Sequence, residues 1–529
     1  MHVFNLAVVA SLFTGSLALD AYHKPHHKPH HKPSEKPSVT VLNTKFVGNL
    51  SDGVESFYGI PYAQPPIGPL RLRRPQPIID GYASRTMQAT ATPTACAQLD
   101  NFFPPTFGFD TGATQQYEGA VLIKKSIDME HPILFVAVNY RVGAFGFLAG
   151  KEVQAEGVSN LGFYDQRLGL QWVQDNIAAF GGDPEKVTIS GESAGGVSAF
   201  SHTLINGGDN LYDGRPLFRG AILGSNSLVP ADEVNGTQAQ AIYDMVIREV
   251  GCTSSSNTLH CLRNVPFEQL RAAANTIPNI FTYSSLAIPF LPRPDPTDSF
   301  FPVSPELALR AGNYTRIPII SGNEEDEATR FSTVQTNLTT TAQLVDYMQI
   351  IFKHSSQSLR QGLVDGYSNN TAAGSPFGTG AKFSLYPQYK RLAAILGDSI
   401  FTLRRREHLS IVADTGSVWS YLDTHRQGQS SLGTYHTSDI EVLFDTKPFV
   451  NGSFGPLPAD TFLSFFVSFT NYLDPNAIDS SKQLIQWPRY TKQDPVLLNI
   501  SASSNTLIQD DFRASNAKYL SDHSSEFRL

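Results

Sequence analysis

The stretch VTISGESAGG contains the pattern Gly-x-Ser-x-Gly around Ser193. Residues 187–190 are apolar and β-branched like a buried strand, and a helical pattern follows the motif. Glycines allow a tight turn between strand and helix that holds a serine in a strained conformation with its hydroxyl exposed. The amides that open the next helix favour developing negative charge. The motif therefore predicts Ser193 as a nucleophile for acyl transfer; the alternative is a glycine-rich turn with a bystander serine.

A serine hydroxyl needs a base to remove its proton, and in strand–serine–helix sites the acid and then a histidine follow along the chain. His436 lies in a turn-like run, GTYHTS, after a strand pattern, which makes it the favoured base. Spacing leaves the other downstream histidines as rivals: His202, His260, His354, His408, His425 and His523.

The acid is predicted among four adjacent carboxylates that follow an apolar strand pattern at 317–321. Four neighbouring acids form a solvated loop more often than a site. Spacing does not choose among them: Glu324, Glu325, Asp326 and Glu327.

Strand and helix patterns alternate around these residues. The run 133–142 is apolar and β-branched, typical of a strand buried on both faces. The run 165–180 has apolar residues at helical spacing and ends at Gly181-Gly182. Strands are also expected at 187–190, 317–321 and 417–422. This alternation predicts an α/β fold with a mostly parallel central sheet covered by helices.

The amino-terminal region has two segments of unusual composition. Residues 1–18 combine a short apolar run with small residues, which predicts a signal peptide; the alternative is a buried N-terminal strand or helix. Residues 19–38 repeat His, Lys and Pro, which predicts a disordered linker whose histidines bind transition metals weakly at most. Residues 39–529 show no repeat or second low-complexity segment, so we expect one large domain.

Composition excludes some classes of function. The chain has 529 residues and a net charge of −8, without a Lys/Arg cluster, which argues against a nucleic-acid partner. No segment after the leader is long and apolar enough to suggest a membrane span. Seven sequons suit a secreted glycoprotein: Asn49, Asn235, Asn313, Asn337, Asn369, Asn451 and Asn499.

The chain has three cysteines, an odd number for a secreted protein. Cys252 and Cys261 bracket a short polar loop that a disulfide could close, with a stabilisation of roughly 2–3 kcal/mol. Cys96 is left without a partner.

Nearly end to end, the chain resembles the type-B carboxylesterase/lipase family, the cholinesterase-like α/β-hydrolases, and within it the secreted fungal and yeast triacylglycerol lipases. The motifs that carry the resemblance are FYGIPYAQPPIGPLRLRRPQP, VNYRVGAFGFLAG, NLGFYDQRLGLQWVQDNIAAFGGDPEKVTISGESAGG, LFRGAILGSNS, IISGNEEDEATRF, LGTYHTSDIEVLF, NYLDPN, QWPRY and DDFRASN.

This resemblance implies an α/β-hydrolase fold with Ser193 as nucleophile, His436 as base and Glu327 as acid. It also matches Cys252 and Cys261 to a family disulfide. The implied reaction is two-step hydrolysis of an ester or lipid substrate by a secreted enzyme, at a lipid–water interface if the substrate is a lipid. It requires no metal and no organic cofactor.

One region departs from the family pattern. There an apolar strand ends in a Gly-Gly-Gly loop whose amides, with the amide after the nucleophile, form the oxyanion hole. Here the corresponding residues read NFFPPTFGFDTGA, which leaves Ala194 and Gly108 as the expected donors. The strand, the lid and the cysteine that would pair with Cys96 are missing together. We therefore expect a contiguous gap near 100–107, and a fold that lacks one or two strands and the lid.

Two other functions remain open. A gap at the oxyanion hole predicts an inactive or weakened esterase, because one lost oxyanion donor slows turnover by about 10²–10³-fold. A non-catalytic binding protein on the same fold is the other alternative, but such relatives typically lose the serine, and Ser193 is present here.

Overall fold

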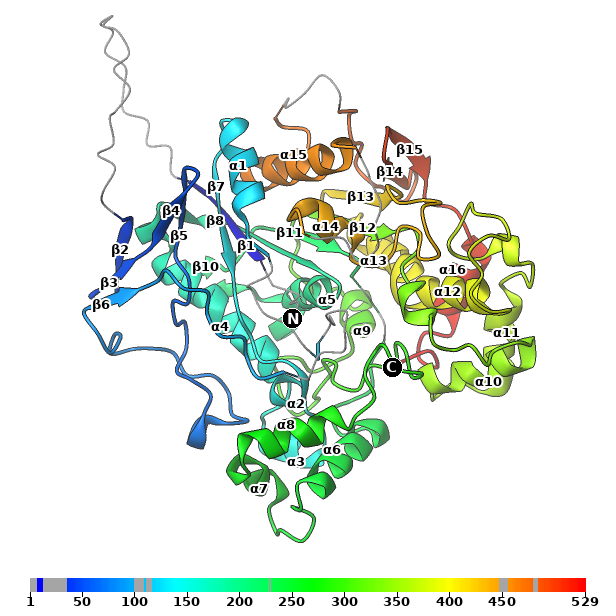
Figure 1. Cartoon of the computed structure of the whole chain (residues 1–529), viewed down its shortest axis with the longest axis horizontal. Coiled ribbons are helices and arrows are strands. Elements are labelled where there is room, and N and C mark those ends of the chain that lie inside the picture. Colours follow the sequence, from blue (N-terminus) through cyan, green and yellow to red (C-terminus); the bar gives the residue numbers. More distant parts are fainter. Residues whose placement is uncertain are drawn as a thin grey trace, which may run out of the picture.

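The computed structural model describes the backbone of residues 7–12 and, with side chains, residues 36–98, 109–110, 117–226, 228, 230–446, 455–478 and 484–529. In this part of the chain an eight-stranded sheet runs through the molecule in the order β15-β14-β13-β12-β11-β8-β1-β7 (Figure 1). Its strands are β1 Ala7–Leu12, β7 Ile133–Ala137, β8 Gly182–Glu192, β11 Gly220–Gly224, β12 Ile319–Glu324, β13 Val418–Asp423, β14 Val496–Ile500 and β15 Asn505–Gln509.

The middle of this sheet is parallel, from β8 through β11, β12 and β13 to β14. In register, Ala221 pairs with Ile189 on one side and with Ile319 on the other. Every residue of β11, β12 and β13 is buried, which requires helices on both faces. The predicted parallel α/β sheet is confirmed.

Helices cover the two faces of the sheet. Successive strand residues point to opposite faces, so Ala221 and Ile222 belong to different hydrophobic clusters. Helices α4, α5, α9 and α13 contribute to the cluster with Ala221, and helices α1, α14 and α15 to the one with Ile222. The helices are α1 Ala120–Asp128, α2 Gly143–Gly146, α3 Lys151–Ala155, α4 Leu161–Asn176, α5 Ala194–His202, α6 Thr237–Glu249, α7 Thr258–Asn264, α8 Phe267–Asn275, α9 Pro305–Arg310, α10 Thr341–Ile351, α11 Gln357–Asp365, α12 Tyr389–Gly397, α13 Leu403–Val412, α14 Ser438–Leu443, α15 Leu457–Tyr472 and α16 Ala514–Asp522.

Smaller elements surround this core. The remaining strands are β2 Ser38–Val41, β3 Thr44–Val47, β4 Asn49–Ser51, β5 Val54–Ser56, β6 Thr86–Gln88, β9 Leu211–Tyr212 and β10 Arg215–Pro216. They form small sheets apart from the central one. Short 3₁₀ turns lie at Gly68–Leu70, Ile177–Phe180, Ile205–Gly208, Arg330–Ser332 and Thr371–Ala373, and a π turn at Asp398–Thr402.

Two predicted elements have different bounds in the structure. The strand expected over 133–142 ends at Ala137, because the following segment turns to bring Arg141 onto the buried carboxylate of Asp165 at 2.7 Å. The helix expected over 165–180 begins at Leu161 and tightens into a 3₁₀ turn that Gly181 ends with φ +86°.

Strand β1 breaks the parallel order and comes from the segment predicted as a signal peptide. It runs antiparallel between β7 and β8, with Val9 opposite Phe135 on one side and Thr188 on the other. Among the described residues, β1 is the one strand that pairs with β7. Most of the predicted 19–38 linker lies outside the described residues, which resume at Lys36.

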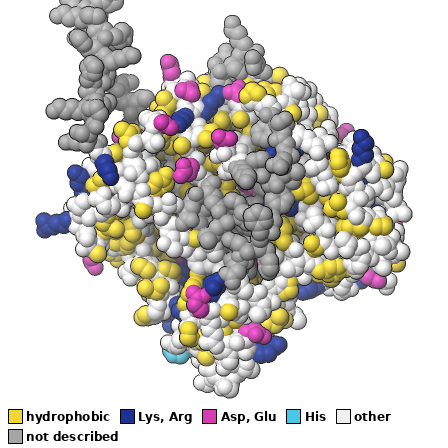
Figure 2. All heavy atoms as spheres, in the orientation of Figure 1, with side chains coloured by type: hydrophobic (Ala, Val, Ile, Leu, Met, Phe, Trp, Pro, Cys, Tyr) yellow, Lys and Arg dark blue, Asp and Glu magenta, His cyan; other side chains and the backbone are white. Residues whose placement is uncertain are grey.

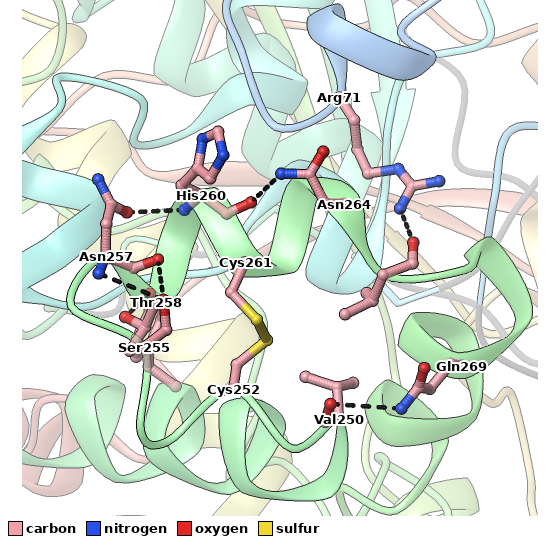
Figure 3. Close-up of a disulfide and its surroundings, with 12 residues drawn as sticks. Arg71, Val250, Cys252, Ser255, Asn257, Thr258, His260, Cys261, Asn264 and Gln269 are labelled. Atoms are coloured by element: carbon pink, nitrogen blue, oxygen red, sulfur yellow. Dashed lines mark hydrogen bonds between the residues drawn. A yellow bond between two sulfur atoms is a disulfide. The ribbon is translucent and has the colours of Figure 1, made fainter.

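Cys252 and Cys261 form a disulfide that ties the end of α6 to α7 (Figure 3). The loop between them is ordered by Asn257, whose side chain accepts a hydrogen bond from the His260 amide at 2.7 Å and caps α7. Cys96 is the free thiol. Burial, with the charge of Asp165, raises the pKa of Cys96 to about 12, so this thiol is unreactive near neutral pH.

The surface agrees with the acidic composition. On the face shown in Figure 2, Lys and Arg side chains are scattered and form no continuous basic patch. Within the described ranges, none of the helices combines the length and apolar character that a bilayer crossing needs.

Candidate active site

The Gly-x-Ser-x-Gly motif forms a sharp turn between β8 and α5. Ser193 has φ 54° and ψ −121°, a strained conformation for a residue with a side chain. Its amide donates to the Gly224 carbonyl at 3.0 Å, which fixes the turn to the neighbouring strand. A Cβ on Gly191 would lie 2.2 Å from the carbonyl carbon of Gly195, so the turn excludes any larger residue there.

Ser193, His436 and Glu327 meet at the carboxyl ends of three strands. The His436 Nε2 atom lies 2.6 Å from Ser193 Oγ, and its Nδ1 atom lies 2.6 Å from Glu327 Oε2. Glu327 follows β12, and His436 stands in the loop between β13 and α14. Both His436 and Glu327 are buried. The serine hydroxyl, imidazole and carboxylate thus form one continuous line of hydrogen bonds.

Of the four predicted acids, Glu327 is the one that contacts His436. Glu324 accepts from Ser438 Oγ at 2.8 Å, Glu325 from Gln427 Nε2 at 3.0 Å, and Asp326 from Ser375 Oγ at 2.7 Å. All but Glu325 are fully buried. The solvated-loop interpretation of this segment is therefore wrong.

The rival histidines have other surroundings. His202 contacts Gln166 at 3.0 Å, and burial lowers its pKa well below the usual value. Burial, with the charge of Arg405, lowers the pKa of His408 to about 3. His354 contacts Asp232, and His425 contacts Asp423 at 2.7 Å. The His260 amide donates to the side chain of Asn257, the cap of α7, and His523 packs against Tyr519.

Glu192, the second residue of the motif, is a site residue that the sequence analysis did not single out. Its Oε1 atom lies 3.6 Å from His436 Nε2, and neither carboxylate oxygen has a hydrogen-bond partner in the described part of the chain. Burial, then the charges of Asp439 and Glu327, raises the pKa of Glu192 well above its usual range. These effects favour the protonated, uncharged form of the Glu192 carboxyl. Its position directly before Ser193 in GESAGG is the sequence feature that could have identified Glu192 as a site residue.

Three further buried side chains at the ends of β12 and β13 form a cluster of titratable groups. Glu324, Asp423 and His425 each offer a ligand atom within 4.8 Å of the others, a spacing that a metal ion could also use. Burial, then the Asp423 charge, raises the pKa of Glu324 well above its usual range. Ser438 Oγ donates to Glu324, and His425 Nδ1 contacts Asp423, so hydrogen bonds within the protein engage this cluster.

The two predicted oxyanion donors differ in what the structure describes. Ala194 is buried at the first turn of α5, directly after Ser193. Gly108 lies outside the described residues. The next residue, Phe109, is buried and lines a pocket of about 80 Å³ beside Ser193. The pocket walls are mainly apolar and include Val197, Leu286, Phe301, Phe331 and Phe401.

A serine at a strand–helix turn, with a histidine and a glutamate from two later strand ends, is the arrangement of an α/β-hydrolase. The family model described as "Carboxylesterase family" matches residues 35–109 and 106–520. Secreted lipase 1 of Botryotinia fuckeliana is 41% identical over 98% of this chain and 98% of its own length. Secreted triacylglycerol lipase LIP1 of Gibberella zeae is 36% identical over 91% of this chain and 90% of its own.

The crystal structure of Aspergillus niger EstA has the same fold, with a TM-score of 0.80 and 22% identity, covering 94% of this chain and 99% of that one. The chain belongs to the carboxylesterase family and is a carboxylic ester hydrolase.

The comparisons also agree with the expected gap. The alignment with Secreted lipase 1 spans 574 positions against 529 residues here, so at least 45 aligned positions are gaps in this chain. The family model matches in two segments that meet at 106–109. In the described part of the chain, β7 is an edge strand of the central sheet and borders a cavity of about 510 Å³ that is also lined by Cys96 and Trp172.

Proposed function

We propose that this chain is a secreted serine esterase whose domain, residues 39–529, cleaves carboxylic esters through an acyl-enzyme on Ser193. The observation that carries the proposal is the line of two 2.6 Å contacts from Ser193 through His436 to Glu327.

In the first step His436 Nε2 takes the proton of Ser193 as Oγ attacks the ester carbonyl carbon. Glu327 holds the imidazole through Nδ1 and stabilises the imidazolium that forms. His436 then gives the proton to the leaving alcohol, and Ser193 carries the acyl group. In the second step His436 removes a proton from water, which attacks the acyl-enzyme and releases the acid and Ser193.

The negative charge that develops on the ester carbonyl oxygen during the attack must be stabilised by hydrogen-bond donors. The Ala194 amide, at the start of α5, is suited to this role, with the Gly108 amide as its proposed second. The shortened segment before Gly108 leads us to expect slower turnover than in an esterase with a complete glycine loop. A chain in which this loss abolishes turnover is the alternative.

The small apolar pocket beside Ser193 favours an apolar acyl group. The similarity of the chain to proteins named secreted lipases supports a lipid ester as the substrate, which the enzyme would meet at a lipid–water interface.

The same names, a predicted leader at residues 1–18 and the sequons support export and glycosylation. In Asn49, Asn235 and Asn499 the amide nitrogen donates a hydrogen bond, whereas Asn313 and Asn369 are exposed, so we favour the latter two for glycans. Asn337 is exposed, but its amide nitrogen donates to Tyr283 Oη at 3.0 Å, and Asn451 lies outside the described residues.

The test is hydrolysis of a short aryl ester and labelling by an organophosphonate, on the full chain and on Ser193→Ala. We expect the variant to lose labelling completely and hydrolysis by at least about 10³-fold. Ser410→Ala, which removes a hydroxyl that bonds within α13, is the control and should keep both. Hydrolysis or labelling that persists in Ser193→Ala contradicts the proposal.

A further inference from the structure

A buried asparagine, Asn323, contacts the carboxylate of Glu327. Its Nδ2 atom donates to Glu327 Oε1 at 2.9 Å, while His436 occupies Oε2 of the same carboxylate at 2.6 Å. The amide of Glu324 is the second donor to Oε1, at 3.0 Å. Both oxygens of Glu327 are therefore held, and the backbone supplies one of the three bonds.

The orientation of the Asn323 amide is determined by its neighbours. Arg405 Nε donates to Asn323 Oδ1 at 2.8 Å. Arginine only donates, and an ionised carboxylate only accepts. The flipped amide would set two donors against each other at Arg405 and two acceptors against each other at Glu327. Asn323 therefore presents Nδ2, and not Oδ1, to Glu327.

Arg405 is itself locked in place. Its Nη2 atom donates to both oxygens of Asp510, at 3.0 and 2.9 Å, and its Nη1 atom donates to Ser420 Oγ at 2.7 Å. Arg405, Asp510 and Asn323 are fully buried. Burial alone would raise the pKa of Asp510, but the charges of Arg405 and Arg406 outweigh it and the pKa is lowered. The lowered pKa favours the ionised form of Asp510, which accepts two hydrogen bonds from the Arg405 guanidinium.

We propose that Asn323, fixed by Arg405 and Asp510, is a positioning residue that holds Glu327 in line with His436. This inference rests on the proposed role of Glu327 as the acid of the triad. Without Asn323 Nδ2, Oε1 keeps the Glu324 amide, and the carboxylate can rotate about its last torsion. Glu327 then no longer points squarely at His436 Nδ1. Small misalignments of this kind lower turnover more than substrate binding.

A purely structural role predicts something different. If Asn323 serves only to satisfy Arg405, its replacement destabilises the fold without changing how His436 takes up a proton. The test therefore reads three quantities: the melting temperature, kcat and KM, and the protonation midpoint of the His436 imidazole followed by NMR. The His436 midpoint can be measured without turnover, so it tests the role of Asn323 even if the shortened oxyanion loop makes the enzyme slow.

Two variants separate the two roles. Asn323→Asp keeps an acceptor for Arg405 but sets a carboxylate against Glu327. The added negative charge should move the His436 midpoint up by about one unit. The acid limb of the rate profile should move with it, kcat should fall about tenfold, and KM should stay within about twofold. Asn323→Leu removes both bonds and should lower kcat by a similar factor.

Ser126→Ala is the matched control, because it removes a buried hydroxyl that bonds the Ile123 carbonyl and the Ile133 amide and contacts neither Arg405 nor Glu327. It should lower the melting temperature and leave kcat and the His436 midpoint unchanged. An unchanged midpoint and kcat in Asn323→Asp overturn the inference. Persisting hydrolysis in Ser193→Ala would instead contradict the proposed triad itself, so the two failures are distinguishable.

Discussion

At the residue scale, the site depends on carboxyl groups that the fold keeps from water. Burial, then the charges of Asp423 and Glu327, raises the pKa of Asp439 to about 8, and Glu192 is raised well above its usual range. Both shifts favour the protonated, uncharged forms of these two carboxyls, while Glu327 is the carboxyl that contacts His436 Nδ1. Burial thus divides the chemistry among groups of the same type.

Asp110 gives a pH-dependent prediction. It is buried, neither carboxylate oxygen has a partner among the described residues, and burial raises its pKa from 3.8 to about 7. A carboxyl with a raised folded pKa favours the folded state fully below pH 3.8, and this contribution is lost as pH rises to about 7.

We therefore expect Asp110→Asn to gain stability relative to the wild type between about pH 4 and pH 7, by on the order of 4 kcal/mol in total. Urea unfolding at several pH values measures this difference. Because a buried amide costs the same at every pH, only the change with pH is diagnostic. A difference that stays flat across this range contradicts the prediction.

At the element scale, the turn between β8 and α5 sets where the nucleophile stands. The turn closes only because Gly191 lacks a side chain opposite Gly195, and because Gly224 of the next strand receives the Ser193 amide. Sheet, turn and helix are therefore coupled at one point.

We expect Gly191→Ala to destabilise the fold by about 3 kcal/mol and to slow hydrolysis about 100-fold or more. The added methyl displaces backbone atoms, and with them the serine. Thermal melting and ester hydrolysis measure the two effects. Gly455→Ala is the control, since its Cβ would meet an ordinary 3.5 Å contact. Equal behaviour of the two variants would show that the close approach does not constrain the turn.

At the scale of the whole molecule, the central sheet depends on a strand from the far end of the chain. β1 joins β7 to β8, in the position beside the nucleophile strand, and it lies within the predicted leader. The family comparisons indicate at least 45 missing positions, with a break near 106–109. One molecule cannot both lose residues 1–18 on export and keep β1.

Removal of residues 1–18 therefore has a defined consequence. We expect this truncated chain to lose its cooperative melt, because the facing edges of β7 and β8 are left unpaired. Circular dichroism compares it with the full chain, and amino-terminal sequencing of the exported protein shows which form occurs. An exported form that starts near residue 19 and melts like the full chain would mean that another segment fills the position of β1.

The sequence alone indicated the local features of this protein. GESAGG marked the turn because its glycines and strand–helix context act over a few residues. Alternating apolar patterns predicted a parallel α/β sheet because burial on both faces requires them. The family resemblance selected His436 and Glu327, which spacing had left among several histidines and four acids.

Only the tertiary structure decided what depends on distant contacts. Ser193 and His436 are 243 residues apart, and His436 and Glu327 are 109 apart, so their distances follow from strand order. The same holds for the contacts of Asn323 with Arg405 and Glu327, for the raised pKa of Glu192, and for β1 between β7 and β8. Local pattern carries no information about which strand ends meet, because burial and pairing between remote segments determine it.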